Sequence, residues 1–545
     1  MSSTESAITN AHSLSWRAKE ITQREIALYA HRTQGSQKAT ERARLVMPLG
    51  VPSSFQAYDP HPIVVKAARG ASMWDVDNNE YVDYDMGFGA LFSGHINPVV
   101  RRAVDEQLDN GTLFVTPCEL NADVAELLGE RYGLPMWRFT NSGTEATMDA
   151  IRVARGASMW DVDDNEYVDY DMGFGALFSG HINPVVRRAV DEQLDNGTLF
   201  VTPCELNADV AELLGERYGL PMWRFTNSGT EATMDAIRVA RGATGREKIV
   251  KVEGGYHGHH DEVMISMKPS LDVAGPADAP ISVPASAGIS KKVLSDTIVI
   301  PYNDARALER VLKSGEVACF IVEPIMENIG ICLPDDGYLQ EVREITEHYG
   351  TLLIFDEVKT GITAGWGGAT GVVGVTPDLV ALAKSIGGGL PIGAFGGKQE
   401  YMDLITSGKV VHLGTYNGNP LCMAAAKAVL SQVCTPEVTA EVIARNGLLV
   451  NAVSEIIHDA SLPAHTVQFG AKGCVTWAEK QIRNYRDYKA SDFDLAFAQW
   501  IHGINRGVLL PPGLDEQWLI SVMHTDADAL HYADVFETFV QELTK

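Results

Sequence analysis

The chain has 545 residues, of which 45% are hydrophobic and 21% charged, an ordinary balance for globular protein with a large core. The length favours two to four domains, and the composition excludes a disordered chain, a collagen-like repeat and a small disulfide scaffold. The 71 acidic residues outnumber the 44 basic ones and give a net charge of −27. Nucleic acids and anionic membranes require a positive protein face, so this charge argues against both as partners.

The first stretch, from Met1 to about Arg44, is polar and carries mixed charges without the apolar core of a secretory signal. Nowhere in the sequence do 18 apolar residues follow one another, so no membrane span is expected. The seven cysteines form no CxxC pair and no metal-ligand spacing, which is typical of reduced, mostly buried thiols. We therefore expect a cytoplasmic protein without a metal site.

A long internal repeat follows this N-terminal stretch. It begins at Ala68 and recurs at Ala154, 86 residues further on, and the two copies differ only at Asn78, which is Asp164 in the second. A solenoid would show drift and at least three copies, so the repeat indicates one recent tandem duplication or an artefact of assembly. The tetrapeptide ARGA opens each copy and stands again at Ala240. Recombination between two such sites in a 459-residue parent is our hypothesis.

A globular fold has room for only one copy of each element. The stretch 62–84 alternates like a β-meander with an Asp-Asn turn, and its first strand begins before the first copy. The helical pattern 230–242 runs directly into an apolar strand pattern at 247–255. We therefore expect copy 68–153 to supply the meander and copy 154–239 the helix, with about 86 residues excluded because loop closure costs little.

Beyond the repeat, short apolar runs bounded by turns alternate with amphipathic helical patterns. The apolar runs lie at 247–254, 296–303, 318–325 and 351–358, and helical patterns lie between them at 304–315 and 338–350. This alternation predicts an α/β fold with a mostly parallel sheet covered on both faces. From about residue 420 helical patterns dominate, with strands near 474–477 and 519–523, and these predict a smaller α+β domain formed with the meander. The expected division is an N-terminal extension (1–45), the N-terminal part of the small domain (46–110), the two copies (68–153 and 154–239, one surplus), a large domain (190–415) and a C-terminal small domain (416–545).

Two charged residues follow buried strand patterns of the large domain. Asp356 stands at the carboxyl end of one, where open α/β sheets bind their ligands; the alternative is an aspartate that caps a helix. Lys384 follows the next apolar run and precedes a glycine-rich stretch. A lysine here is commonly solvated, whereas a buried one can be an amine nucleophile. The glycines do not match the GxxxxGK[ST] pattern of a nucleotide phosphate loop.

Two further motifs add an anion site and an aromatic plane. Ser228, Gly229 and Thr230 open a helix whose free N–H groups can bind an anion, although a simple N-cap explains them equally. Tyr256 lies among glycines just after a strand, and the histidines beside it lack the H-x-x-x-H spacing of a metal site. An anion cradle, an aromatic plane, a strand-end carboxylate and a buried amine together fit pyridoxal phosphate.

From about residue 44 to the C-terminus, apart from the extra copy, the sequence resembles the class III pyridoxal-phosphate aminotransferases. Within them it is most similar to the glutamate-1-semialdehyde 2,1-aminomutase branch and its transaminase relatives. The resemblance implies the fold type I architecture, with the cofactor in the large domain, and a homodimer. It rests on the motifs FTNSGTEATMDAIRVARG, GGYHGHHD, VEPIMENIG, LLIFDEVKTG, LAKSIGGGLPIGAFGG and GTYNGNPL.

The resemblance implies three catalytic residues. Lys384 would bind the cofactor aldehyde covalently and later move a proton between the substrate Cα and the cofactor C4′. Asp356 would pair with the pyridinium nitrogen and keep the ring an electron sink. Glu516 matches a carboxylate that lies near this lysine in the aminomutase branch.

The remaining implied residues hold the cofactor. Tyr256 would stack on the ring, Val358 would lie against its opposite face, and Asn328 would contact the ring hydroxyl. Thr415 would reach the phosphate of the neighbouring subunit. The phosphate of the same subunit would lie at Ser228, Gly229 and Thr230, whose equivalents in the first copy are Ser142, Gly143 and Thr144.

Departures from the branch affect the expected substrate. Gln56 stands where the branch has an arginine for the substrate carboxylate, Phe88 (Phe174 in the second copy) replaces a tryptophan, and Lys359 replaces an apolar residue and offers another carboxylate contact. These changes favour a transaminase acting on a small-molecule amino donor and a carbonyl acceptor, with intramolecular aminomutase chemistry as the alternative. A third hypothesis is a non-catalytic protein, because an extra copy could expose sheet edges.

Overall fold

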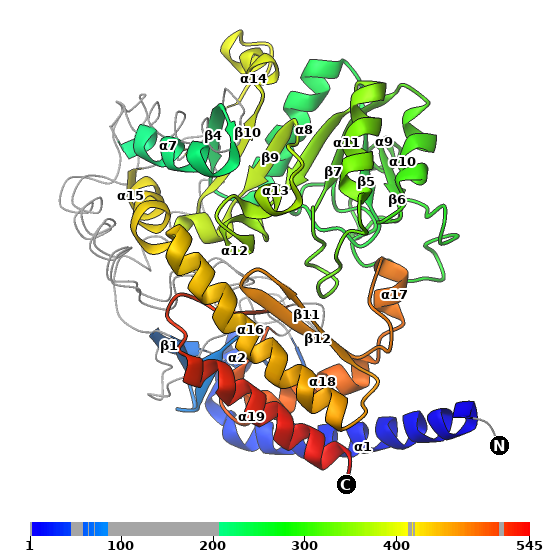
Figure 1. Cartoon of the computed structure of the whole chain (residues 1–545), viewed down its shortest axis with the longest axis vertical. Helices are drawn as coiled ribbons and strands as arrows, with labels where there is room; N and C mark the ends of the chain where they lie inside the picture. The colour runs from blue at the N-terminus through cyan, green and yellow to red at the C-terminus, as the bar shows by residue number, and fades with distance from the viewer. Residues whose placement is uncertain are drawn as a thin grey trace.

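A computed structural model describes residues 3–44, 58–63, 65–69, 71–84, 206–412, 417, 420–511 and 517–545. In the described part the chain forms a large α/β body and, beside it, a second body of long helices and small sheets (Figure 1). None of the helices in these ranges is long and apolar enough to cross a membrane.

A seven-stranded sheet forms the centre of the large body. Only β10 runs antiparallel to its neighbours β4 and β9, and the other pairs are parallel, so the predicted mostly parallel sheet is confirmed. Every residue of β7 and of β8 is buried, as expected for apolar strands covered on both faces. The strand order is β4 (Met222–Thr226), β10 (Gly393–Gly397), β9 (Leu379–Leu382), β8 (Leu352–Asp356), β7 (Val317–Val322), β5 (Lys248–Val252) and β6 (Thr297–Ile300).

Helices pack against this sheet. The helix α8 (Gly229–Thr244) contacts five strands, from β4 to β7 in the order of the sheet, and α11 (Tyr338–Tyr349) contacts β8. The helix α8 ends at Gly245, whose φ of +66° suits glycine as a left-handed cap. The other helices of this body are α7 (Leu206–Tyr218), α9 (Lys291–Asp296), α10 (Ala305–Leu312), α12 (Gly361–Ala364), α13 (Gly368–Val373), the 3₁₀ turn η3 (Lys384–Gly387) and α14 (Gln399–Thr406).

The second body joins the two ends of the chain. The helix α1 packs on α18 and α19, and α16 packs on α19. One small sheet has the order β1-β2-β3-β13, and the other the order β11-β12-β14. The helices are α1 (Ser3–Arg32), α2 (Gln34–Arg44), α16 (Pro436–Asp459), α17 (Tyr485–Lys489), α18 (Phe493–Ile504) and α19 (Asp526–Leu543). Before α16, the helix α15 (Pro420–Ala428) and the π-turn η4 (Val429–Val433) contact α7 and η3 of the large body. The strands are β1 (Val65–Arg69), β2 (Ser72–Asp75), β3 (Glu80–Asp83), β11 (His465–Phe469), β12 (Lys472–Thr476), β13 (Val508–Leu509) and β14 (Trp518–Leu519).

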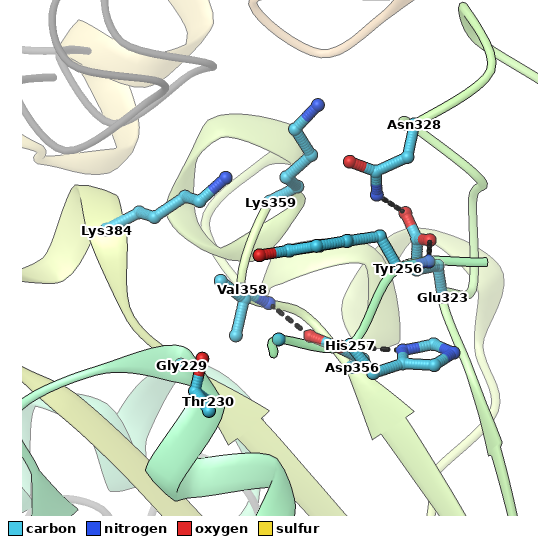
Figure 2. Close-up of a pocket in the computed structure, with 11 residues that line it drawn as sticks. Gly229, Thr230, Tyr256, His257, Glu323, Asn328, Asp356, Val358, Lys359 and Lys384 are labelled. Atoms are coloured by element: carbon cyan, nitrogen blue, oxygen red, sulfur yellow. Dashed lines mark hydrogen bonds and ion pairs between the residues drawn. The ribbon is translucent and has the colours of Figure 1, made fainter. Parts of the chain in front are cut away.

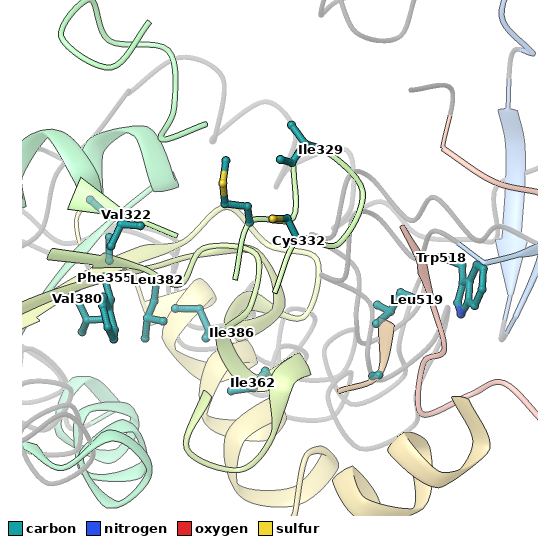
Figure 3. Close-up of a cluster of buried hydrophobic side chains, with 14 of the residues drawn as sticks. Val322, Ile329, Cys332, Phe355, Ile362, Val380, Leu382, Ile386, Trp518 and Leu519 are labelled. Atoms are coloured by element: carbon teal, nitrogen blue, oxygen red, sulfur yellow. The ribbon is translucent and has the colours of Figure 1, made fainter. Parts of the chain in front are cut away.

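The hydrophobic core is continuous between the two bodies. Phe355 and Leu382 of the large sheet lie in one buried cluster with Trp518 and Leu519 of the second body (Figure 3). The N-terminal helices join the same cluster, because Ala18 and Tyr29 of α1 are fully buried. The segment expected as an extension is therefore packed into the second body.

Both copies of the repeat contribute described elements. The meander β1–β3 lies at residues 65–83, at the start of the first copy, and its β3 pairs with β13 near the C-terminus. The elements α7, β4 and α8 come from the second copy. Residues 85–205, which hold the rest of both copies, lie outside the described residues. The expected division between the copies and the domain boundaries stay predictions.

Candidate active site

A pocket of about 120 Å³ opens at the carboxyl edge of the large sheet (Figure 2). Residues of this pocket come from the ends of five strands, because strands that run in the same direction end at the same edge. Asp356 ends β8, Lys384 comes two residues after β9, and Glu323 directly follows β7. The lining consists of Gly229, Thr230, Tyr256, His257, Gly258, Glu323, Asn328, Asp356, Val358, Lys359 and Lys384.

Lys384 has a backbone conformation that is uncommon for a side-chain-bearing residue. Its φ is +51°, in the left-handed region, and non-glycine residues in this region are worth attention because such strain is concentrated at functional sites. The residue is half-buried, and its amino group points into the pocket (Figure 2). The structure therefore places the predicted lysine in the predicted cavity.

Asp356 forms a buried pair with His257. Its Oδ2 lies 2.8 Å from His257 Nδ1, and its Oδ1 accepts the Val358 N–H at 3.0 Å. Burial and the charge of Lys251 together lower the pKa of His257 to about 3, so the imidazole is neutral, and when Asp356 is ionised the Nδ1–H of His257 donates to its carboxylate. Burial raises the pKa of Asp356 to about 7, against the opposing effects of the Val358 N–H and of Lys384.

Glu323 holds two residues of the pocket wall. Its Oε1 accepts the backbone N–H of Tyr256 at 2.9 Å, and its Oε2 accepts the side-chain amide of Asn328 at 2.7 Å and the N–H of Glu327 at 3.0 Å. Burial raises the pKa of Glu323. One buried carboxyl group therefore fixes the aromatic side and the amide side of the pocket together.

The turn that carries Tyr256 is held by contacts with β5 and with α17. Lys251 is fully buried in β5, and its Nζ donates to the carbonyls of Gly255 and Ile265, each at 2.7 Å. Burial lowers the pKa of this ammonium to about 7. Gly254 has a φ of +82°, and a Cβ there would lie 2.6 Å from the ring of Tyr485 in α17. The turn therefore depends on a lysine of the sheet and on close packing by the second body.

The start of α8 forms one end of the pocket. Ser228 is the N-cap, and its hydroxyl accepts the N–H of Glu231 at 3.2 Å. A Cβ on Gly229 would lie only 2.8 Å from both methyl groups of Val358, so this position requires glycine. Thr230 Oγ1 lies 3.2 Å from His259 Nδ1. Of the three predicted phosphate residues, Gly229 and Thr230 line the pocket, whereas Ser228 caps the helix beside it.

Seven predicted site residues therefore meet in one pocket, together with Lys359, which the sequence singled out as a departure from the family pattern. Sequence reasoning missed His257, Gly258 and Glu323, although the quoted motifs GGYHGHHD and VEPIMENIG contain them. The histidines were considered only as metal ligands, and no group of three or more potential ligands lies in the described ranges. The predicted residues outside the described residues are Thr415, Glu516, Gln56, Phe88, Phe174, Ser142, Gly143 and Thr144.

Comparisons with known proteins show the family of this chain. The family model described as "Aminotransferase class-III" matches residues 54–159 and 154–484. The glutamate-1-semialdehyde 2,1-aminomutase of Methanocella arvoryzae is 42% identical over 381 residues, which cover 69% of this chain and 88% of that protein. The enzyme of the same name from Bacillus subtilis is 40% identical over 405 residues, 73% of this chain and 92% of that protein.

Solved structures share the fold. An omega-transaminase from Sphaerobacter thermophilus superimposes with a TM-score of 0.73 at 28% identity, covering 94% of this chain and 98% of its own. A glutamate-1-semialdehyde aminomutase from Pseudomonas aeruginosa, solved in complex with PMP, also has a TM-score of 0.73; at 24% identity it covers 97% of this chain and 98% of its own and supports the fold alone. The predicted α/β fold of type I pyridoxal-phosphate enzymes is confirmed. By its sequence match and its fold, the chain belongs to the class-III aminotransferase family.

Proposed function

We propose that this chain is a pyridoxal-phosphate-dependent aminotransferase that moves an amino group from a small amine or amino-acid donor to a keto or aldehyde acceptor. The observation that carries the proposal is the meeting of Lys384 and Asp356 in one pocket, at the ends of the neighbouring strands β9 and β8. Membership of the class-III aminotransferases supports the reaction class.

The residues of the pocket fit this cofactor. Asp356 is buried with its pKa raised to about 7, so it is only partly ionised near pH 7, and a cation such as a protonated pyridine nitrogen beside it would favour the carboxylate. The cradle between Gly229 and Val358 has no room for a Cβ, and close backbone approach at a helix N-terminus suits a phosphate. Tyr256 supplies an aromatic plane at the same pocket.

Each residue then has a role. Bound pyridoxal phosphate supplies an aldehyde that condenses with primary amines and a ring that withdraws electrons. Asp356, oriented by His257, would hold a proton at the ring nitrogen, and Gly229 and Thr230 would bind the phosphate through N–H groups of α8. Lys384 Nζ would take the proton from the substrate Cα as a general base, a role that requires direct access to the pocket.

The aminomutase reaction is the second candidate. It is favoured by the relatives of about 40% identity that carry the aminomutase name, whereas Gln56, Phe88 and Lys359 favour the transaminase. A donor amine added to the purified protein separates them, because a transaminase accumulates the keto product and an aminomutase does not. The non-catalytic alternative has no support from the family match.

Covalent labelling tests the cofactor and its lysine directly. The protein is incubated with pyridoxal phosphate, reduced with borohydride and digested, and the modified peptide is identified by mass. The expected label is on Lys384, and labelling of Lys251, Lys359 or Lys472 instead would overturn the assignment. The Lys384→Ala variant should lose both the label and the visible absorbance, and Lys313→Ala is the matched control, because Lys313 directly follows α10 and 57% of its side chain is exposed.

We further propose a homodimer in the cytoplasm. The class III resemblance implies a dimer in which Thr415 reaches the neighbouring phosphate, and the five cysteines among the described residues are buried free thiols, in keeping with a reducing compartment. Light scattering of the purified protein tests the dimer.

We also propose that the repeat is a tandem duplication with one surplus copy. The overlapping family matches at 54–159 and 154–484 and the placement of β1–β3 and α8 in different copies support it. Deletion of residues 154–239 should preserve the absorbance and activity. Loss of both, in a variant that stays folded, would show that the extra copy is needed.

A further inference from the structure

A two-point ion pair joins the second body to the turn that carries Tyr256. Glu253 directly follows β5 in the large body, and Arg486 lies on α17 in the second body. Arg486 Nε donates to Glu253 Oε2 at 2.7 Å, and Arg486 Nη2 donates to Oε1 at 2.8 Å. Because the planar guanidinium meets both oxygens of one carboxylate, the pair fixes the direction of the contact as well as its length.

Both members of this ion pair are also held by other contacts. The backbone N–H of Glu253 donates to the carbonyl of Ile300 in β6 at 2.9 Å. Asn484, the N-cap of α17, accepts the backbone N–H of Arg486 at 2.8 Å, and the Arg486 side chain also donates to the carbonyl of Ala274 at 3.2 Å. The side chain of Glu253 is 2% exposed and that of Arg486 is 18% exposed, so solvent screens their attraction less than at a surface pair.

The residue beside Arg486 fills the space next to the turn. Gly254 has a φ of +82°, and the ring of Tyr485 occupies the place that a Cβ on Gly254 would need. Tyr485 is fully buried, and its hydroxyl donates to the carbonyl of Pro269 at 2.8 Å. Two consecutive residues of α17 therefore contact two consecutive residues at the start of the turn.

Tyr256 follows these two contacts directly in the chain. Its backbone N–H is held by Glu323, so the turn is fixed by the second body at its start and by the end of β7 at Tyr256. Figure 2 shows the Tyr256 ring extending into the pocket, with its hydroxyl on the side of Lys384. The position of this ring therefore depends on contacts with both bodies.

We propose that Arg486 is a positioning residue, which through Glu253 holds the Tyr256 ring where it stacks on the cofactor. This inference rests on the proposed aminotransferase function, because stacking requires bound pyridoxal phosphate. It adds that the packing of the second body against the large body controls how well the cofactor is held. Aromatic rings attract one another over a narrow range of offsets and separations, so a displaced turn should weaken the stacking while the protein stays folded.

Titration of the cofactor-free protein with pyridoxal phosphate, followed by visible absorbance and circular dichroism, tests this role. In Arg486→Met the dissociation constant should rise about 10-fold, the effect of losing one hydrogen bond to a charged group, and the visible circular dichroism of the bound cofactor should decrease. Glu253→Gln should act in the same direction. Arg486→Lys keeps the charge but loses the two-point contact, so its dissociation constant should lie between those of the wild type and Arg486→Met.

Arg483→Met is the matched control. Arg483 lies three residues before Arg486 and also contacts both oxygens of a carboxylate in the large body, that of Asp335. Its side chain is 64% exposed, and such pairs contribute little. This variant should leave the dissociation constant and the circular dichroism unchanged.

A double-variant cycle separates positioning from a general loss of stability. In Tyr256→Leu the aromatic plane is gone, so adding Arg486→Met should change the dissociation constant by less than about 2-fold, because the two residues act through the same contact. A general loosening of the fold would instead give the same change with and without Tyr256. If Arg486→Met does not fold, Glu253→Gln takes its place in the cycle.

The outcomes distinguish this inference from the proposed function. A wild-type protein that neither binds pyridoxal phosphate nor becomes labelled at Lys384 contradicts the proposed function itself. A wild-type protein that binds the cofactor, with equal dissociation constants for Arg486→Met and Arg483→Met, overturns only the role of Arg486. The same conclusion follows if Arg486→Met has its full effect in the Tyr256→Leu background.

Discussion

Two polar networks border the same pocket, and they differ in the origin of their residues. The pair of Asp356 and His257 lies within the large body, at the ends of β8 and β5. A second network, which we call the lysine cluster, joins Glu327 and Lys359 of the large body to Lys472 and Gln517 of the second body. The first network surrounds a carboxylate that the proposed reaction uses, whereas the second joins the two bodies through a buried ion pair. The first can therefore form from the edge of one sheet, and the second forms only where the two bodies pack together.

The largest expected effect concerns the lysine cluster. In Lys472→Met, Glu327 keeps its buried charge but loses the ammonium at 2.5 Å. Breaking a buried ion pair from one side costs about 3–5 kcal/mol, so the free energy of unfolding in urea should fall by that amount. The double variant Lys472→Met/Glu327→Gln should recover part of the loss. A decrease below about 1 kcal/mol, the size expected for an exposed pair, would show that the pair contributes little to the join between the bodies.

A slightly smaller effect is expected from the other network. In Asp356→Asn the residue can no longer oppose a cationic ring nitrogen, and kcat/KM should fall roughly 10²–10³-fold, as when one preorganised electrostatic group is removed. Stopped-flow measurement of the donor half-reaction checks this. Asp459→Asn, with 83% of its side chain exposed, is the matched control. Equal activity of the two variants would show that Asp356 takes no part in the reaction.

The pH dependence of stability provides a third comparison. Burial raises the pKa of Asp356 from 3.8 to about 7, so the folded cofactor-free protein holds a proton that the unfolded chain releases. Its contribution to the free energy of unfolding therefore decreases as pH rises through this window. Asparagine does not titrate. The free energy of unfolding of Asp356→Asn, relative to that of the wild type, should therefore increase between about pH 4 and pH 8 by on the order of 2–4 kcal/mol.

Urea unfolding of both cofactor-free proteins at several pH values measures this difference. The lowered pKa of His257 has the opposite sign, since it adds stability as pH rises from about 3 towards 6.5. His257 is present in both proteins, so most of its effect cancels in the difference. A constant difference across the range would mean that Asp356 is not protonated in the folded protein at low pH.

The smallest expected effect is at the residue that links the two networks. Glu323 accepts N–H groups from Tyr256 and from Glu327, and Glu323→Gln replaces one acceptor oxygen by a donor. The dissociation constant for pyridoxal phosphate should rise about 10-fold, corresponding to one weakened hydrogen bond. A cofactor titration followed by absorbance measures it, with Glu309→Gln on α10 as the control. No change would show that the two networks act independently.

Much of the fold could be predicted because its strands and helices follow from local patterns of apolar and polar residues. The apolar runs at β5 to β8 and the helical pattern ending at Gly350 gave elements close to those in the structure. The strand β10 was missed because its sequence, GAFGG, lacks the branched residues typical of strands. Its glycines are required by packing, since a Cβ on Gly393 would lie 2.1 Å from Thr226 Oγ1. A sequence pattern does not show such a contact.

The site residues also fall into those that the sequence identified and those that it missed. Lys384, Asp356 and Tyr256 were identifiable because each stands just after a strand or an apolar run in a recognisable motif. Glu323 was missed because its importance comes from the groups that it accepts, Tyr256 in another loop and Asn328 further along the chain. The wider lysine cluster was missed because Lys472 is 145 residues from Glu327 in sequence.

The sequence by itself determined the strand-and-helix order, the family and the residues at the ends of neighbouring strands, because these depend on local pattern and on motifs. Only the tertiary structure decided which buried charges meet, that Ser228 caps α8 while Gly229 lines the pocket, and that Lys359 enters the pocket beside Lys384. The physical reason is that burial and partnership set the energy of a charged group. Both depend on segments that approach one another only when the two bodies pack together.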